Sequence, residues 1–152
     1  MSKPLILVSN DDGITSKGIR VLVSIMKKLG EVVVVAPDSP QSGMGHAITI
    51  GETLRLYDED IFDGIAAYKS SGTPADCVKF GVNELLEKKP DLCVSGINHG
   101  SNSSVNVLYS GTVGAAIEAG IQGIPAVGFS VLDYNWNAKF EHMKKFILSI
   151  TL

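Results

Sequence analysis

Four short aliphatic runs along the chain each end in polar or turn-forming residues. They lie within residues 5–8, 32–36, 91–95 and 126–130. A strand with one face in water alternates apolar and polar side chains, whereas these runs are mostly continuous. We therefore predict four strands that are buried on both faces of a sheet.

Between and after these runs, apolar residues recur at the three- and four-residue intervals of an amphipathic helix. The spacing predicts helices over 18–29, 74–88 and 139–150, and a helix of small residues over 112–120. Buried strands that alternate with helices are typical of an α/β fold with a doubly wound, largely parallel sheet. We expect that fold here.

Residues 46–70 interrupt the alternation. Shorter, partly alternating pieces at 47–50, 54–57 and 65–69 are separated by Gly and acidic residues. We predict an excursion of short strands, some of them antiparallel. The chain ends at Leu152, directly after a helix, so either the domain is small or the sequence is an N-terminal fragment of a longer chain.

Composition narrows the class of protein. The chain has 152 residues, of which 45% are hydrophobic and 19% charged, and a net charge of −3, which fits one globular domain with a substantial core. No Lys/Arg cluster offers the basic face that a nucleic-acid polymer requires.

No apolar stretch reaches the roughly 20 residues of a membrane span, and the first residues do not have the pattern of a signal peptide, so we expect a cytoplasmic protein. Cys77 and Cys93 lie in apolar runs without metal-ligand spacing, which favours buried reduced thiols.

The first strand is followed directly by Asn10-Asp11-Asp12-Gly13. Ligands of open α/β sheets gather outside the carboxyl ends of the strands. Two adjacent carboxylates there repel each other unless a cation or hydrogen-bond donors hold them. The same residues also suit a turn with an Asx cap before a helix. From this tetrapeptide alone, both readings stay open.

Three further polar loops are expected near the same edge. Residues 37–43 offer hydroxyls, and residues 95–102 offer the amide oxygen of Asn98 for a hard cation. Residues 109–112 open the small-residue helix, where backbone N–H groups form an anion site without Lys or Arg. A Ser/Thr N-cap at that helix start is compatible with anion binding.

Other polar and aromatic residues are less specific. His46 and His99 lie in these loops and are candidates to act on a leaving group or orient a phosphate, or are simply solvated. Asp76 falls in the first turn of a predicted helix and reads as a cap. Tyr134 and Trp136 are expected to be packing groups rather than platforms for base stacking.

Taken together, the order and spacing of these segments resemble the survival protein SurE family. The segments that carry the resemblance are SNDDG at 9–13, PDSPQSG at 37–43, GTPADCV at 72–78, SGINHG at 95–100 and YSGTVGAA at 109–116. The resemblance covers essentially the whole chain and implies a single α/β core domain over 1–152 with a Rossmann-like core. It also implies that the C-terminal part of the family, which takes part in dimer exchange, is missing.

The resemblance implies a metal-dependent phosphatase that acts on nucleoside 5′- and 3′-monophosphates, some relatives acting also on short polyphosphate. By that resemblance, the ligands of one divalent metal, Mg²⁺ or Mn²⁺, are Asp11, Asp12, Ser42 and Asn98. Catalytic roles fall on Asp11, Asp12 and Asn98, and phosphate contacts on Asn10, Ser110, Gly111 and Thr112. The full-length chain would be a homo-oligomer, a dimer or tetramer, without nucleic-acid or membrane partners.

The residue chemistry suits this activity, because the four proposed ligands are all oxygen atoms and suit a hard cation. The cation would bind a phosphate oxygen, stabilise transferred charge, and position or acidify a water. We rank this above an aspartate acting as base or nucleophile. Two alternatives remain: a receiver-like signalling domain, for which the later strands lack the expected Asp and Lys, and a non-catalytic module that binds nucleotide and metal.

Overall fold

A computed structural model describes residues 3–135 and 137–151. Its centre is a six-stranded sheet in the order β3-β4-β2-β1-β5-β6. The strands are β1 (Leu5–Ser9), β2 (Glu31–Pro37), β3 (Leu56–Asp58), β4 (Ala66–Ser70), β5 (Leu92–His99) and β6 (Ala126–Val131). All neighbouring strands are parallel except β3 and β4. The prediction of a largely parallel sheet with an antiparallel excursion is therefore confirmed.

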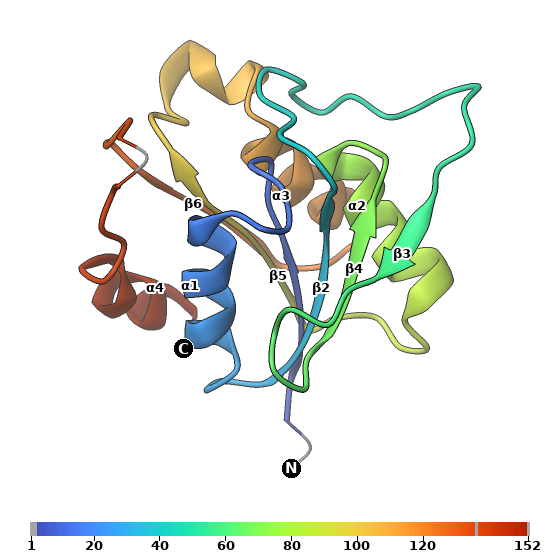
Figure 1. Cartoon of the computed structure of the whole chain (residues 1–152), viewed down its shortest axis with the longest axis horizontal. Helices are drawn as coiled ribbons and strands as arrows, with labels where there is room; N and C mark the ends of the chain where they lie inside the picture. Colours follow the sequence, from blue (N-terminus) through green and yellow to red (C-terminus); the bar gives the residue numbers. More distant parts are fainter. Residues whose placement is uncertain (1–2, 136, 152) are drawn as a thin grey trace.

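Helices cover both faces of the sheet (Figure 1). They are α1 (Lys17–Met26), α2 (Pro74–Phe80), α3 (Gly111–Ile121) and α4 (Met143–Thr151). The apolar sides of α1 and α4 form one core with the sheet, which includes Ile19, Leu22 and Ile147. The second core, on the other face, joins the sheet to α2 and α3 through Cys77 and Ala115. This doubly wound, Rossmann-like arrangement is the predicted fold.

The two central strands are buried along their length because each packs against helices on both sides. Every residue of β1 is buried, and in β2 only Glu31 is exposed. Long aliphatic runs without alternation are the expected sequence for such strands. Cys77 and Cys93 lie buried as free thiols, and burial raises the pKa of both. The expectation of reduced, buried cysteines is confirmed.

One predicted strand does not form. Residues 47–50 belong to a long irregular loop that connects β2 to β3. Their polar backbone groups bond to side chains instead of to a neighbouring strand: the Thr49 N–H donates to the Asp76 carboxylate, and the Ala47 carbonyl accepts from the Thr73 hydroxyl. The alternation of apolar and polar residues at 47–50, which predicts a strand, therefore belongs to a loop that contacts the start of α2 along one side.

Element ends also differ from the prediction. Helix α2 gives way at its C-terminus to a π-helical turn, η1 (Gly81–Leu85), in which the Leu86 N–H bonds to the Gly81 carbonyl. Strand β5 extends to His99, so residues predicted as a loop belong to the strand.

Helix α4 starts later than predicted, because the chain first turns to bury Phe140 completely. A 3-10 helix, η2 (Ser104–Leu108), precedes α3. Among the described residues, no helix is long and apolar enough to cross a membrane.

Candidate metal centre

The polar loops meet at one edge of the sheet because β1 pairs in parallel with both β2 and β5. In the register of these strands, Ser9 at the end of β1 lies beside Ser95 of β5. A cavity of about 580 Å³ opens at this edge. It is lined by Asp12, Gly13, Thr15, Ser16, Lys17, Asp38, Pro40, Ser42, Asn98, His99 and Tyr134. Three of the four residues predicted as metal ligands thus line one cavity, and the fourth, Asp11, is buried behind it.

Asp11 is fixed from two sides. Its carboxylate accepts a hydrogen bond from the Thr112 hydroxyl (Oγ1 to Oδ1, 2.7 Å), and its carbonyl accepts from the Gln41 N–H at 2.7 Å. Burial raises the pKa of Asp11, although hydrogen bonds from Thr112 and from the Gly111 backbone oppose the rise. The carboxylate is therefore held in one orientation inside the protein.

The start of α3 lies directly against Asp11. A Cβ atom on Gly111 would come within 2.7 Å of the Asp11 Cβ atom, so only glycine permits this approach. The Ser110 hydroxyl caps the helix by accepting from the Val113 N–H at 3.1 Å, as predicted. The positive end of the α3 dipole thus faces a carboxylate. Contact of Ser110, Gly111 and Thr112 with a phosphate stays a prediction.

Asp12 faces the cavity. Burial and the neighbouring Asp11 carboxylate raise the pKa of Asp12 to about 6, while His99 lowers it through its charge and a backbone hydrogen bond. Among the described residues, the Asp12 Oδ2 atom is buried without a hydrogen-bond partner. A buried carboxylate oxygen that lacks a donor is costly, and a cation would relieve that cost.

Asn10 organises the turn between β1 and α1. Its amide nitrogen donates to the Gly13 carbonyl at 2.9 Å and to the Ser16 hydroxyl at 2.8 Å. The turn reading of this tetrapeptide and the cation reading are therefore compatible. Asn10 is 1% exposed, and its Oδ1 atom lacks a hydrogen-bond partner in the described part of the chain. A role in phosphate binding stays a prediction.

Asn98 comes from the end of β5, after a register irregularity between β5 and β6. Its amide nitrogen lies 3.2 Å from the Asn102 Oδ1 atom and 3.4 Å from the Gly100 carbonyl. Because the nitrogen is turned toward these acceptors, the oxygen is the amide atom that a cation in the cavity would meet.

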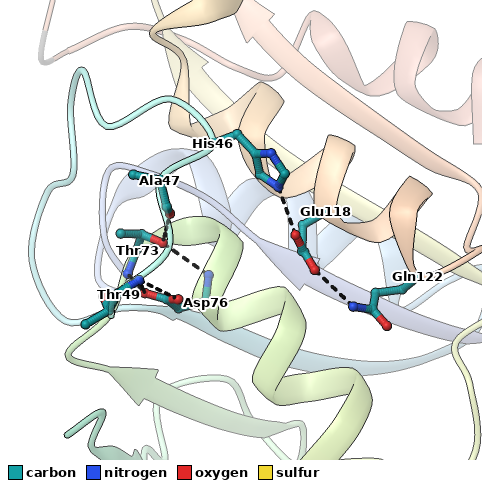
Figure 2. A network of polar contacts seen from close by, with 7 residues as sticks. All are labelled: His46, Ala47, Thr49, Thr73, Asp76, Glu118 and Gln122. Atoms are coloured by element: carbon teal, nitrogen blue, oxygen red, sulfur yellow. Dashed lines mark hydrogen bonds and ion pairs between the residues drawn. The ribbon is translucent and has the colours of Figure 1, made fainter. Parts of the chain in front are cut away.

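Ser42 is exposed on the long loop after β2. The preceding residue, Gln41, ties the loop to the Asp11 carbonyl, and further anchors follow along the loop. The Gly45 N–H donates to the Tyr109 carbonyl at 3.0 Å. The His46 Nε2 atom lies 2.8 Å from the buried Glu118 carboxylate on α3, which also accepts from Gln122 (Figure 2). His46, which the sequence left open, therefore contacts a buried acid of α3.

A second anchor ties the same loop to α2. Thr73 and Asp76 form a reciprocal capping box at the start of α2, which confirms the predicted capping role of Asp76. Asp76 also accepts from the Thr49 hydroxyl at 2.6 Å, and the Thr73 hydroxyl donates to the Ala47 carbonyl at 2.6 Å (Figure 2). The cap thus fixes both the helix and the loop.

Several cavity residues were not anticipated from the sequence. Ser16 and Lys17 place the N-terminus of α1 at the cavity, and the Lys17 ammonium donates to the Ala138 carbonyl at 2.9 Å. Tyr134, expected to be a packing group, is 74% exposed at the cavity. Trp136 lies outside the described residues. No local pattern marks Tyr134, because its position depends on how the segment after β6 folds back toward β5.

The cavity is not a site built from many charged ligands. Within residues 3–135 and 137–151, no three or more His, Cys, Asp or Glu side chains gather in a group that could hold a metal ion. Asp12 and Asp38 line the cavity, and Asp11 is buried. Of the four predicted ligands, Asp11 and Asp12 are acids, while Ser42 offers a hydroxyl and Asn98 an amide. Fold and site together define an α/β protein with a polar cavity at the carboxyl edge of its largely parallel sheet, where Asp12, Ser42 and Asn98 come together.

Comparisons with known proteins agree with that class. The family Survival protein SurE matches residues 6–151, and the chain belongs to this family. A protein named 5′-nucleotidase SurE from Cytophaga hutchinsonii is 68% identical over 99% of this chain and 58% of its own length. One of the same name from Flavobacterium psychrophilum is 65% identical over 100% of this chain and 60% of its own length.

A solved structure gives the same result. The crystal structure of the SurE protein from Aquifex aeolicus is similar with a TM-score of 0.86 and 45% identity, over 97% of this chain and 58% of that chain. The chain therefore spans about three fifths of the length of these relatives.

Proposed function

We propose that the chain carries the catalytic core of a metal-dependent phosphomonoesterase, which hydrolyses nucleoside 5′- and 3′-monophosphates to nucleoside and phosphate. The observation that carries the proposal is the cavity in which Asp12 is joined by Ser42 and Asn98, with Asp11 held behind it. The relatives that bear the name 5′-nucleotidase SurE support the part of the proposal that concerns 5′-monophosphates.

The residues present fit a divalent cation. Asp12 has a buried carboxylate oxygen for which the described part of the chain offers no hydrogen-bond partner, and the neighbouring Asp11 carboxylate repels it. Two carboxylates, a hydroxyl and an amide oxygen form the ligand set that Mg²⁺ or Mn²⁺ prefers. We infer one such ion per chain, bound by Asp11, Asp12, Ser42 and Asn98.

A bound divalent ion supplies Lewis-acid stabilisation of phosphate charge and activation of a water molecule. The residues of the chain orient the ligands of this ion and attract the phosphate. Thr112 fixes the Asp11 carboxylate, and the contacts of Asn98 fix its amide. The N-terminus of α1 and the Lys17 charge favour an anion in the cavity.

The phosphate would lie between the ion and these positive groups. We assign catalytic roles to Asp11, Asp12 and Asn98. We also assign phosphate contacts to Asn10 and to the α3 start at Ser110, Gly111 and Thr112, which are buried and are not among the residues that line the cavity. The first residues of α3 contact Asp11, so the positive end of the α3 dipole stabilises the negative charge of the Asp11 carboxylate.

The two alternatives have less support. A receiver-like domain needs a phosphate-accepting Asp and a Lys at later strand ends, whereas β5 and β6 carry Asn98 and Ser130 near their ends. A non-catalytic module would explain the cavity but not the activity in the names of the relatives.

We also propose that the full-length protein is a homo-oligomer, a dimer or tetramer. Large apolar side chains such as Ile121 on α3 and Leu132 after β6 are well exposed and are available for contacts between subunits. Light scattering during size exclusion would reveal a monomer if this proposal is wrong.

The activity is tested by measuring phosphate release from 5′-AMP and 3′-AMP with Mg²⁺ or Mn²⁺, on this chain and on the full-length Cytophaga hutchinsonii relative. We expect release that a chelator stops and that Asp12→Asn abolishes. Release that persists in the chelator, or in the variant, would refute the proposal.

A further inference from the structure

The cavity carries a residue that the metal chemistry does not use. Tyr134 lies in the segment after β6 and lines the same cavity as Asp12, Ser42 and Asn98. The residue is 74% exposed, so its ring is accessible to a ligand in the cavity. The site therefore presents an open aromatic ring beside the proposed metal ligands.

The Tyr134 ring packs against the backbone that directly follows β5. A Cβ atom on Gly100 would lie 2.5 Å from the Tyr134 Cε1 atom and 3.1 Å from Cδ1 and Cζ, so glycine is needed to let the ring lie there. Gly100 also has a φ of +94°, which independently favours glycine. The Tyr134 hydroxyl accepts a hydrogen bond from the Ser101 N–H at 3.3 Å.

The segment that carries the ring is itself tied down. The His99 Nδ1 atom lies 3.3 Å from the Asp133 carbonyl, and the Asp133 carboxylate accepts from the Asn135 N–H at 2.9 Å. His99 directly follows the proposed ligand Asn98. The ring is thus fixed relative to the metal site rather than placed on an unattached loop.

One side of the ring rests on Gly100, and most of the residue is open to the cavity and to solvent. Among the described residues that line the cavity, the other aromatic ring is that of His99, which packs edge-on against Phe140 at 5.1 Å. A cavity of about 580 Å³ is large enough for a ligand the size of a nucleotide. Aromatic stacking tolerates any base, since every base has a π face.

We propose that Tyr134 is a specificity-determining residue whose ring stacks on the base of a nucleoside monophosphate, while the phosphate lies at Asp12 and Asn98. This inference rests on the proposed function for its substrate class. It adds that the site distinguishes nucleotides from sugar phosphates and other phosphomonoesters without a base.

Measurements of ligand affinity test the stacking role independently of catalysis. The ligands are the methylene phosphonate analogues of AMP and of ribose 5-phosphate, neither of which can be hydrolysed. Their affinities for the protein are measured by isothermal titration calorimetry in the presence of Mn²⁺. The variants are Tyr134→Leu, which removes the ring, and Tyr134→Phe, which keeps it. Tyr57→Leu, at a half-exposed tyrosine on β3 away from the cavity, is the matched control.

We expect the wild type to prefer the AMP analogue, and Tyr134→Leu to weaken its binding by about tenfold to a hundredfold. Affinity for the ribose 5-phosphate analogue should stay unchanged, and Tyr134→Phe and Tyr57→Leu should behave as wild type. The inference is overturned if the wild type shows no preference for the base, or if Tyr134→Leu weakens both analogues equally or neither. AMP binding without phosphate release would refute the proposed activity and leave the stacking role standing.

Discussion

The two halves of the candidate site are built in opposite ways. Asp11 and Asp12 follow β1 in a turn packed among the sheet, α1 and α3, where burial raises the pKa of both carboxyls. Ser42 is exposed on a long loop that is anchored beside it, where the Gln41 N–H donates to the Asp11 carbonyl, and further along at Gly45, His46 and Thr49. The buried half supplies charge at an energetic cost, whereas the exposed half supplies a neutral ligand whose position depends on several contacts along its loop.

The two halves should respond differently to substitution. In the buried half, changing one atom of a carboxylate or its partner should alter the cation site directly. In the exposed half, the loop has several anchors, so losing one should shift the ligand only slightly. Variants of the two halves should therefore differ in the size of their effect on metal binding.

Removing the cavity-facing charge should have the largest effect. Asp12→Asn is expected to weaken Mn²⁺ binding by more than about 100-fold, because it removes a charged ligand and not merely a supporting group. The unfolding midpoint without metal should not fall, since the carboxylate is buried next to Asp11. Calorimetric titration with Mn²⁺ and thermal unfolding measure both, and Asp63→Asn at an exposed loop residue is the control. Wild-type Mn²⁺ affinity in Asp12→Asn would show that the Asp12 carboxylate is not a metal ligand.

The next largest effect is expected from the group that orients Asp11. Thr112→Val keeps the shape of the side chain but removes the hydroxyl that donates to the Asp11 carboxylate. Loss of such a supporting hydrogen bond should weaken Mn²⁺ binding about 10- to 100-fold. Exposed Thr53 offers the control Thr53→Val, which should bind Mn²⁺ as wild type does. If both variants bind equally well, Thr112 has no part in the site.

A smaller effect is expected from the exposed ligand itself. Ser42→Ala removes one neutral oxygen, so Mn²⁺ affinity should fall only about tenfold. Ser39→Ala changes a serine of the same loop whose hydroxyl donates to Asp38 at 2.8 Å, and it should leave the affinity unchanged. Equal losses in the two variants would show that loop structure, rather than a Ser42 ligand, is responsible.

The smallest effect is expected from a single remote anchor. His46→Leu removes the contact with buried Glu118, which keeps its bond to Gln122. We expect a loss of about 1 kcal/mol in the free energy of unfolding and only a slight loss of Mn²⁺ affinity. His46→Gln, which can still donate to Glu118, should restore part of the stability. A loss of Mn²⁺ binding as large as that of Asp12→Asn would show that the exposed half is not held by several anchors.

The same contrast explains what the sequence could predict. Strands β1 and β2 and the pair Asp11-Asp12 follow from local patterns, because continuous aliphatic runs and the turn residues after them depend on few distant partners. The prediction of a strand at 47–50 is wrong because the hydrogen bonds of that loop go to Thr73 and Asp76, far along the chain. The place of Tyr134 could not be predicted for a similar reason, since its seat on Gly100 exists only in the folded protein.

Pulsed electron paramagnetic resonance of Mn²⁺ added to the chain examines the proposed metal site most directly. We expect one bound ion per chain, coordinated by oxygen atoms, without a directly bonded nitrogen even though His99 lines the same cavity. The signal of this ion should disappear in Asp12→Asn. A strong coupling to a ligand nitrogen, or bound Mn²⁺ that persists in the variant, would show that the oxygen-only site proposed here does not exist.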